Sequence, residues 1–192
     1  MALNTLRSLI KGRHVCPWWL IHTFDNRLRR IFEKPESILS GLVSAGQTAL
    51  DIGCGIGFFT LPLARIVGVE GSVIAADLQD RMLAGVKRKA DRAGLTSRIR
   101  FHRCQPETVG LTEAVDFILA HWMVHEVPDK ERFLREVHAL LKPGAYFLLV
   151  EPLGHVSRKS FDKTLTLACQ AGFRHVAAPK VGLSRAALFT RF

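Results

Sequence analysis

The sequence contains no hydrophobic run of the length that crosses a bilayer, which takes about 20 residues in a helix. The apolar segment Trp18-Trp19-Leu20-Ile21 ends at once in His22. Cysteine pairs spaced C-x-x-C, the usual signature of a zinc site, are also absent. The four cysteines are Cys16, Cys54, Cys104 and Cys169. These absences favour one soluble, cytoplasmic domain with reduced thiols and no metal ion.

Acidic residues are scarce, because 17 Asp and Glu stand against 27 Lys and Arg, a net charge of +10. The basic residues gather in residues 81–103 and 158–191, and two interpretations are open. A nucleic-acid surface is one; the solvated face of a helix is the other. We favour the second, because the apolar residues of 79–93 follow helical spacing and aromatics, at 8%, supply no base-stacking platform. An acidic or phosphorylated small molecule is also compatible with the charge.

The most informative segment is Asp51-Ile52-Gly53-Cys54-Gly55-Ile56-Gly57, a glycine-rich turn between an apolar strand pattern and a helical pattern. Glycines at this spacing let backbone N–H groups approach a ligand and deliver it to a helix N-terminus. Asp77 ends the next apolar run, 20 positions after Gly57. A carboxylate at that distance is typical of a ribose-binding residue. The segment therefore predicts a cofactor that contains a nucleoside.

Two details argue against a dinucleotide. The fingerprint G-x-G-x-x-G fails in both registers, since Phe58 and Thr60 occupy the positions of its third glycine. Asp51 would also repel a pyrophosphate. A carboxylate there suits a ligand that carries an ammonium and a sulfonium, as S-adenosyl-L-methionine (SAM) does.

With these residues, Asp51-x-Gly53-x-Gly55-x-Gly57 resembles motif I of the class I SAM-dependent methyltransferases. Segments 73–83, 116–121 and 140–152 are similar to the family's second strand and following helix, its fourth strand, and the turn into its fifth strand. The resemblance is nearest to the small-molecule group that includes the ubiquinone and menaquinone C-methyltransferases.

The resemblance implies an α/β fold. Its parts are a Rossmann-like, seven-stranded, mostly parallel sheet, helices on both faces, an antiparallel last strand and an N-terminal helical lid. Residues 1–45 are expected to form the arm or lid, and residues 46–192 the SAM-binding domain. Strands are expected at 48–52, 72–77, 98–103, 115–120, 145–151, 173–179 and 184–191. Helices are expected at 17–33, 57–67, 79–93, 129–141 and 158–172, and Pro35 is expected to open a further short helix.

Ligands of such sheets bind beyond the carboxyl ends of the strands. The residues expected to bind SAM are Asp51, Gly53, Cys54, Gly55, Gly57, Asp77, Leu78, Gln105, Pro106 and His121. The resemblance implies that Asp77 binds the ribose hydroxyls and that Leu78 packs on the adenine. Gln105 stands where relatives often carry an acid. Asp77 also has a purely structural interpretation, as the N-cap of the helix that follows it.

The expected catalytic residues are His121, His125 and Glu151, since a base assists methyl transfer to a phenol, carbon acid or alcohol. His125 and Glu126 equally fit the capping of a turn. The residues expected to bind the substrate are Trp19, His22, Phe24 and Trp122, the first three from the lid.

The expected activity is methyl transfer from SAM to a small-molecule acceptor, with S-adenosyl-L-homocysteine as the product. An RNA methyltransferase, favoured by the charge, and a non-catalytic SAM-binding subunit are the alternatives. Intact motif I residues argue against the non-catalytic subunit.

Overall fold

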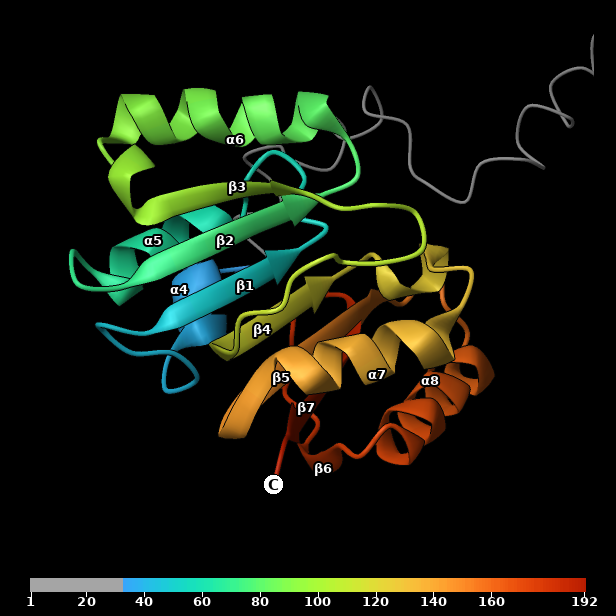
Figure 1. The fold of residues 1–192 in the computed structure, drawn as a ribbon. Coiled ribbons are helices and arrows are strands. Elements are labelled where there is room, and N and C mark those ends of the chain that lie inside the picture. Colours follow the sequence, from blue (N-terminus) through green and yellow to red (C-terminus); the bar gives the residue numbers. More distant parts are fainter. Residues whose placement is uncertain (1–32) are drawn as a thin grey trace, which may run out of the picture.

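The computed structural model describes residues 33–192, which form a central sheet with helices on both sides (Figure 1). The helices are α4 (Pro35–Leu39), α5 (Thr60–Val67), α6 (Asp80–Ala93), α7 (Lys130–Leu140) and α8 (Arg158–Gln170), with short 3-10 turns η1 (Thr96–Arg98) and η2 (Val124–Glu126). The strands are β1 (Thr48–Ile52), β2 (Ser72–Asp77), β3 (Ile99–Arg103), β4 (Val115–His121), β5 (Leu141–Pro152), β6 (Arg174–Ala177) and β7 (Ser184–Thr190).

The seven strands lie in the order β3-β2-β1-β4-β5-β7-β6. Neighbours from β3 through β5 pair in parallel, while β7 runs antiparallel to both β5 and β6. The chain therefore starts in the middle of the sheet, builds one half, and crosses to the other half between β3 and β4. This order confirms the predicted mostly parallel sheet with an antiparallel last strand. It also places the reversal of strand order between β1 and β4, where ligands of such sheets bind.

Side-chain alternation along the strands divides the core into two layers. On one face, residues such as Leu119 and Val150 pack with Leu39, Leu63 and Val86 of helices α4, α5 and α6. The other face packs against α7 and α8, and its buried residues include Ile118, Leu149, Leu134 and Phe161. Because both faces are covered, the central strands are apolar throughout, as parallel strands usually are.

Several element boundaries differ from the prediction. Helix α5 begins at Thr60 rather than at residue 57, because Gly55 and Gly57 have φ angles of 52° and 87°, which a right-handed helix excludes. Strand β5 begins at Leu141, which already pairs with Val115, and not at residue 145. A register shift follows this pair, so residues 142–144 stay exposed inside the strand. Strand β6 is shorter than predicted.

Local sequence explains where the helices of the second layer begin. The Asp129 side chain accepts the Arg132 N–H at 2.9 Å and caps α7, and the Ser157 hydroxyl accepts the Ser160 N–H at 3.1 Å and caps α8. Both caps follow loops that leave the carboxyl ends of β4 and β5. The capping residues therefore fix the course of the segments that carry candidate site residues.

Residues 1–32 of the predicted lid (1–45), and with them the predicted helix 17–33 apart from its last residue, lie outside the described part of the chain. Within residues 33–192, no helix is both long enough and apolar enough to cross a membrane.

Candidate active site

The glycine-rich turn between β1 and α5 is fastened to the end of β2 by backbone hydrogen bonds. The Gly53 and Cys54 N–H groups both donate to the Ala76 carbonyl oxygen, at 2.8 and 3.1 Å. The Gly55 N–H donates to Oδ2 of Asp77 at 3.0 Å. The turn and the predicted ribose-binding residue therefore form one rigid unit at the carboxyl ends of adjacent strands.

Asp77 accepts hydrogen bonds at both carboxylate oxygens. Besides Gly55, the Gln79 N–H donates to Oδ1 at 2.9 Å, directly ahead of α6. The structural interpretation of Asp77 as the N-cap of this helix is wrong, because the N-cap is Gln79; the Asp77 side chain instead holds the Gln79 N–H and the glycine turn. Burial raises the pKa of this carboxyl to about 6, and the backbone hydrogen bonds oppose the rise.

Asp51 is the second carboxylate of this unit and is buried near the end of β1. Its Oδ2 accepts the Thr60 hydroxyl at 2.6 Å, which ties the strand to the first residue of α5. Burial, followed by the charges of Asp51 and Asp77, raises the pKa of the Cys54 thiol well above its ordinary value. The turn therefore lies in a negative potential, which favours a cationic ligand over a pyrophosphate.

The other predicted cofactor contacts lie at the ends of β2 and β3. The Cys104 N–H donates to the Asp77 carbonyl oxygen at 3.0 Å, so residue 105 follows directly beside Asp77. Gln105 and Pro106 are exposed in a tight turn, while Leu78 is half-buried against the layer of α7 and α8. Their positions are compatible with an adenine between them, and their roles stay predictions.

His121 ends β4 and points into the layer of α4, α5 and α6. Its ring centroid lies 4.6 Å from that of Phe59 and 5.0 Å from that of Trp122. Its Nε2 lies 3.5 Å from Oε1 of Glu33, and both side chains are buried. His121 therefore belongs to a packed group of buried side chains on the face of α4, α5 and α6.

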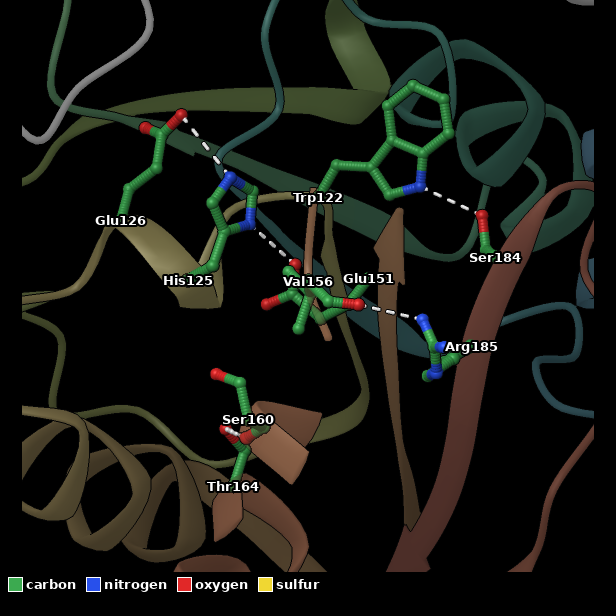
Figure 2. Close-up of polar contacts among 9 residues, drawn as sticks. All are labelled: Trp122, His125, Glu126, Glu151, Val156, Ser160, Thr164, Ser184 and Arg185. Atoms are coloured by element: carbon green, nitrogen blue, oxygen red, sulfur yellow. Dashed lines mark hydrogen bonds and ion pairs between the residues drawn. The ribbon is translucent and has the colours of Figure 1, made fainter. Parts of the chain in front are cut away.

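His125 and Glu151 meet on the other face of the sheet. His125 lies in η2 after β4, Glu151 lies near the end of β5, and Nδ1 of His125 is 2.6 Å from Oε2 of Glu151. Glu151 is only 2% exposed, whereas the His125 ring reaches solvent. Figure 2 shows His125 between Glu151 and Glu126, whose Oε1 lies 3.9 Å from Nε2. The His155 ring lies nearby, 4.9 Å from that of His125 between centroids.

The three predicted catalytic residues therefore separate into two groups. His125 and Glu151 form a hydrogen-bonded pair in which a carboxylate orients the imidazole through Nδ1, while Nε2 lies on the side of Glu126. This is the arrangement of a general base with its orienting group. His121 faces the opposite layer, where its neighbours include Phe59, Trp122 and Glu33.

Trp122 adopts φ = 58°, the sole positive φ of a non-glycine residue within the described range. Such a conformation is costly for a bulky residue and is held here by surrounding bonds. The Trp122 N–H donates to the Val150 carbonyl at 2.8 Å, and the indole Nε1 donates to the Ser184 hydroxyl at 2.9 Å (Figure 2). The turn carries the chain from the face of His121 to the face of His125. Of the predicted substrate residues, Trp122 is the one described here, since Trp19, His22 and Phe24 lie outside the described residues.

The structure adds residues that the sequence did not single out. A Cβ atom at Gly53 would lie 2.8 Å from Cγ of Met123, so the glycine turn touches the segment that carries His125. Glu33 contacts His121, and Arg185 of β7 lies opposite Glu151 in the strand register. No local signal marks these residues, because each comes from a distant element. Only the antiparallel pairing of β5 and β7 reveals the placement of Arg185.

The fold and the position of the site define a nucleoside-binding, doubly wound α/β domain. The "Methyltransferase domain" family matches residues 50–149, which run from β1 into β5. This match covers just over half of the 192 residues. The chain therefore belongs to this family, the class I SAM-dependent methyltransferases.

Individual relatives agree with this assignment. A ubiquinone/menaquinone biosynthesis C-methyltransferase, UbiE, of Klebsiella pneumoniae is 32% identical over 156 residues, which are 81% of this chain and 59% of that protein. The chain thus spans less than two thirds of that relative. The crystal structure of a SAM-dependent methyltransferase from Aquifex aeolicus superposes with a TM-score of 0.83 at 25% identity, covering 93% of this chain and 100% of the other. A TehB-like SAM-dependent methyltransferase from Corynebacterium glutamicum shares the fold, with a TM-score of 0.70 at 19% identity over 91% of this chain and 94% of the other.

Proposed function

We propose that the protein transfers a methyl group from SAM to a small-molecule acceptor, with His125 as the general base and Glu151 as its orienting partner. The observation that carries this proposal is the 2.6 Å contact between Nδ1 of His125 and the buried carboxylate of Glu151. This pair lies at the carboxyl ends of β4 and β5. The segment that carries His125 also carries Met123, which faces Gly53 of the glycine turn. The UbiE relatives are named as C-methyltransferases of ubiquinone and menaquinone biosynthesis, and this name supports a small organic acceptor.

The residues around the glycine turn fit the cofactor. The Asp77 carboxylate accepts backbone N–H groups from Gly55, Leu78 and Gln79, and an ionised carboxylate, with about four acceptor sites, has room for a ribose hydroxyl as well. The negative potential of Asp51 and Asp77 suits the ammonium and sulfonium groups. No Lys or Arg occurs between residues 51 and 60 to attract a pyrophosphate. When bound, SAM supplies an electrophilic methyl group on a positively charged sulfur.

The protein's own contribution is proton removal and placement. Because Nδ1 of His125 donates to Glu151, Nε2 is the atom left to accept a proton from an acceptor hydroxyl or activated carbon. The resulting imidazolium is stabilised by the Glu151 carboxylate at 2.6 Å. Met123 and Trp122 hold this segment against the glycine turn and β7, which keeps the base close to the cofactor unit.

We also propose a cytoplasmic location, supported by reduced cysteines at positions 54, 104 and 169. The basic composition supports an acceptor of acidic character.

The test combines binding and turnover. S-adenosylhomocysteine, SAM and NAD are titrated calorimetrically into wild-type protein and Asp77→Asn, and methyl transfer is then followed with a panel of phenolic and enolic acceptors. We expect micromolar binding of the two adenosyl ligands, no binding of NAD, and a marked loss in the variant. A folded protein that ignores both adenosyl ligands overturns the proposal. If the protein binds the adenosyl ligands but methylates none of the acceptors, RNA included, the alternative of a non-catalytic SAM-binding subunit is favoured.

A further inference from the structure

We infer that Arg185, together with the N-terminus of α8, forms an anion-binding subsite that selects acceptors with a carboxylate group and an apolar body. This inference rests on the proposed function, since it names the acceptor class of the same site. The residue lies opposite Glu151 in the β5–β7 register. It is therefore one strand away from the proposed base and on the same face of the sheet.

One hydrogen bond fixes the guanidinium and leaves most of its donors available. Nη1 of Arg185 donates to the Val156 carbonyl oxygen at 2.7 Å (Figure 2). A guanidinium has five N–H donors in a planar fork, which matches a carboxylate in bidentate fashion. Among residues 33–192, no Asp or Glu oxygen lies within 4.0 Å of this guanidinium, and the nearby Glu151 is bound to His125.

Arg185 lies beside a helix N-terminus that carries further basic side chains. Val156 immediately precedes Ser157, the N-cap of α8, so the guanidinium lies beside the positive end of the helix dipole. The first turn of α8 contains no acidic residue and begins with Arg158 and Lys159. Two carboxylates lie near this place, and both have partners: Asp162 of α8 pairs with Arg158, and Glu151 with His125. A carboxylate ligand is the anion that suits a guanidinium beside a helix N-terminus.

An apolar edge borders the same place. Leu153 follows β5 and Leu183 precedes β7, and the Leu153 N–H donates to the Leu183 carbonyl at 3.1 Å. Their side chains are 44% and 70% exposed, among the most exposed large apolar residues in the described range. Each stands two positions from a polar site residue, Glu151 or Arg185. The acceptor that fits carries its acid group on Arg185 and its apolar body over these leucines.

A matched ligand pair tests the subsite. Cinnamate and cinnamamide have the same planar apolar body and differ in a carboxylate against a neutral amide. Their affinities are measured by NMR titration, with S-adenosylhomocysteine saturating, for the wild type, Arg185→Gln, Arg185→Lys and the control Lys180→Gln. Lys180 is an exposed basic residue of the same C-terminal region, so its loss reproduces the change in net charge. Thermal melting and the S-adenosylhomocysteine titration verify the fold of each variant.

We expect the wild type to bind cinnamate at least about tenfold more tightly than cinnamamide, as a desolvated charge-assisted pair should. The preference disappears in Arg185→Gln, is reduced but present in Arg185→Lys, and is unchanged in Lys180→Gln. Leu183→Ser weakens both ligands equally. Three results would overturn the inference: equal affinities in the wild type, no binding of either ligand up to about 10 mM, or a preference that survives in Arg185→Gln. In each case Arg185 is a structural residue of the 152–157 turn.

If Arg185→Gln fails to fold, Arg185→Lys decides the question, because a preference that this variant leaves undiminished overturns the inference. The S-adenosylhomocysteine titration reports separately on the proposed function. Its failure in the wild type rejects the methyltransferase assignment. Intact cofactor binding with equal acid and amide affinities rejects only the Arg185 subsite.

Discussion

The backbone N–H of Gly55 donates to Oδ2 of Asp77 at 3.0 Å, so the side chain expected to bind the cofactor ribose also holds the loop expected to bind its other end. The carboxylate is buried and has a pKa of about 6. In the protein without cofactor, protonation near neutral pH is therefore within reach. Cofactor affinity and loop order should depend on the ionisation of this one group.

The first prediction concerns pH and cofactor affinity. Ribose hydroxyls donate to an ionised Asp77 and lower its pKa in the complex, so binding should weaken as pH falls below about 6. The dissociation constant of S-adenosylhomocysteine should rise by up to about tenfold per pH unit between pH 6 and 5. Calorimetric titrations at half-unit steps of pH measure this slope.

Asp77→Asn is the control for this slope, because the amide does not titrate. Its affinity should be weaker throughout and independent of pH over the same range. A wild-type affinity that is flat from pH 7 to 5 contradicts a role for Asp77 in binding a hydroxyl donor.

The same shift predicts how stability varies without cofactor. A carboxyl whose pKa is 3.8 when unfolded and about 6 when folded binds protons more strongly in the folded state. Asp77 should therefore favour the folded state below about pH 4, and this contribution should be lost as pH rises to about 6. The difference between these two pKa values corresponds to roughly 3 kcal/mol of folding free energy. Urea unfolding of the wild type, relative to Asp77→Asn, between pH 4 and 7 measures the difference.

Two glycines with similar backbone angles separate strain from steric contact. Gly53 (φ 70°) faces Met123, whereas Gly94 (φ 65°) ends α6 with nothing within 4 Å of an added Cβ. We expect Gly94→Ala to cost about 1 kcal/mol for its left-handed conformation. Gly53→Ala should cost about 2–4 kcal/mol, since an added methyl also displaces Met123, and it should weaken S-adenosylhomocysteine binding. Chemical unfolding and calorimetry of both variants test this; equal costs in the two variants argue against the contact between loop and η2.

The strands and the glycine turn could be predicted because their signals are local. Apolar runs of five to seven residues mark β1, β2 and β4, and the spacing of Gly53, Gly55 and Gly57 marks the turn. The predicted start of α5 was wrong because the backbone angles of Gly55 and Gly57 decide where the helix can begin, and the sequence leaves these angles free. Strand β5 extends to Leu141 because pairing with Val115 prevails over the Pro and Gly that follow.

The grouping of the site residues could not be predicted. His121, His125 and Glu151 all lie at or just beyond the carboxyl ends of β4 and β5. Sequence alone does not say that Trp122, at φ = 58°, turns the chain between the two faces of the sheet. Alternation along β5 places Glu151 with Leu149, on the face of α7 and α8, only after the sheet is known. Glu33 and Arg185 enter from elements more than 30 positions away from their contacts in β4 and β5.

The paired His125 and Glu151 should act as one unit. We expect His125→Asn to lower kcat by about 10²–10⁴-fold on a protic acceptor, and Glu151→Gln to lower it less, since the imidazole is then oriented without a charge. Both variants should bind S-adenosylhomocysteine like the wild type. His121→Asn is the comparison from the opposite face and should change stability more than kcat. Steady-state kinetics with melting curves separate these outcomes; a loss of kcat in His121→Asn alone would assign the base to the other face.

The described cysteines should differ sharply in reactivity. Burial raises the pKa of Cys104 to about 12, with the charges of Asp77 and Glu136 adding to the effect, and the pKa of Cys54 is also raised. Cys169 is exposed on α8. At pH 8 iodoacetamide should therefore modify Cys169 within minutes and leave Cys54 and Cys104 intact, because the thiolate is the reactive form. Peptide mass spectrometry maps the sites, and labelling in urea shows that all can react. Rapid modification of Cys54 in folded protein would contradict the closed packing of the glycine turn.

Arg191 should be the main anchor of the C-terminal strand to α7. Its Nη1 donates to the carbonyl oxygens of His138, Ala139 and Leu141, at 3.2, 3.1 and 2.8 Å, around the C-terminal end of α7, where the helix leaves carbonyl groups short of helical donors. A cation at a helix C-terminus also interacts favourably with the dipole. We expect Arg191→Ala to cost about 1.5–3 kcal/mol and to lower Tm by roughly 4–10 °C for a chain of this size.

The matched control is Arg174→Ala on β6. The Arg174 guanidinium lies 3.9 Å from the ring centroid of Phe192, a surface cation–π contact worth about 0.5–1 kcal/mol. Differential scanning calorimetry of both variants compares the same loss of charge with and without the loss of carbonyl contacts. If Arg191→Ala melts within about 2 °C of Arg174→Ala, the three carbonyls are satisfied by water, and the anchor lies instead in the antiparallel pairing of β5 with β7.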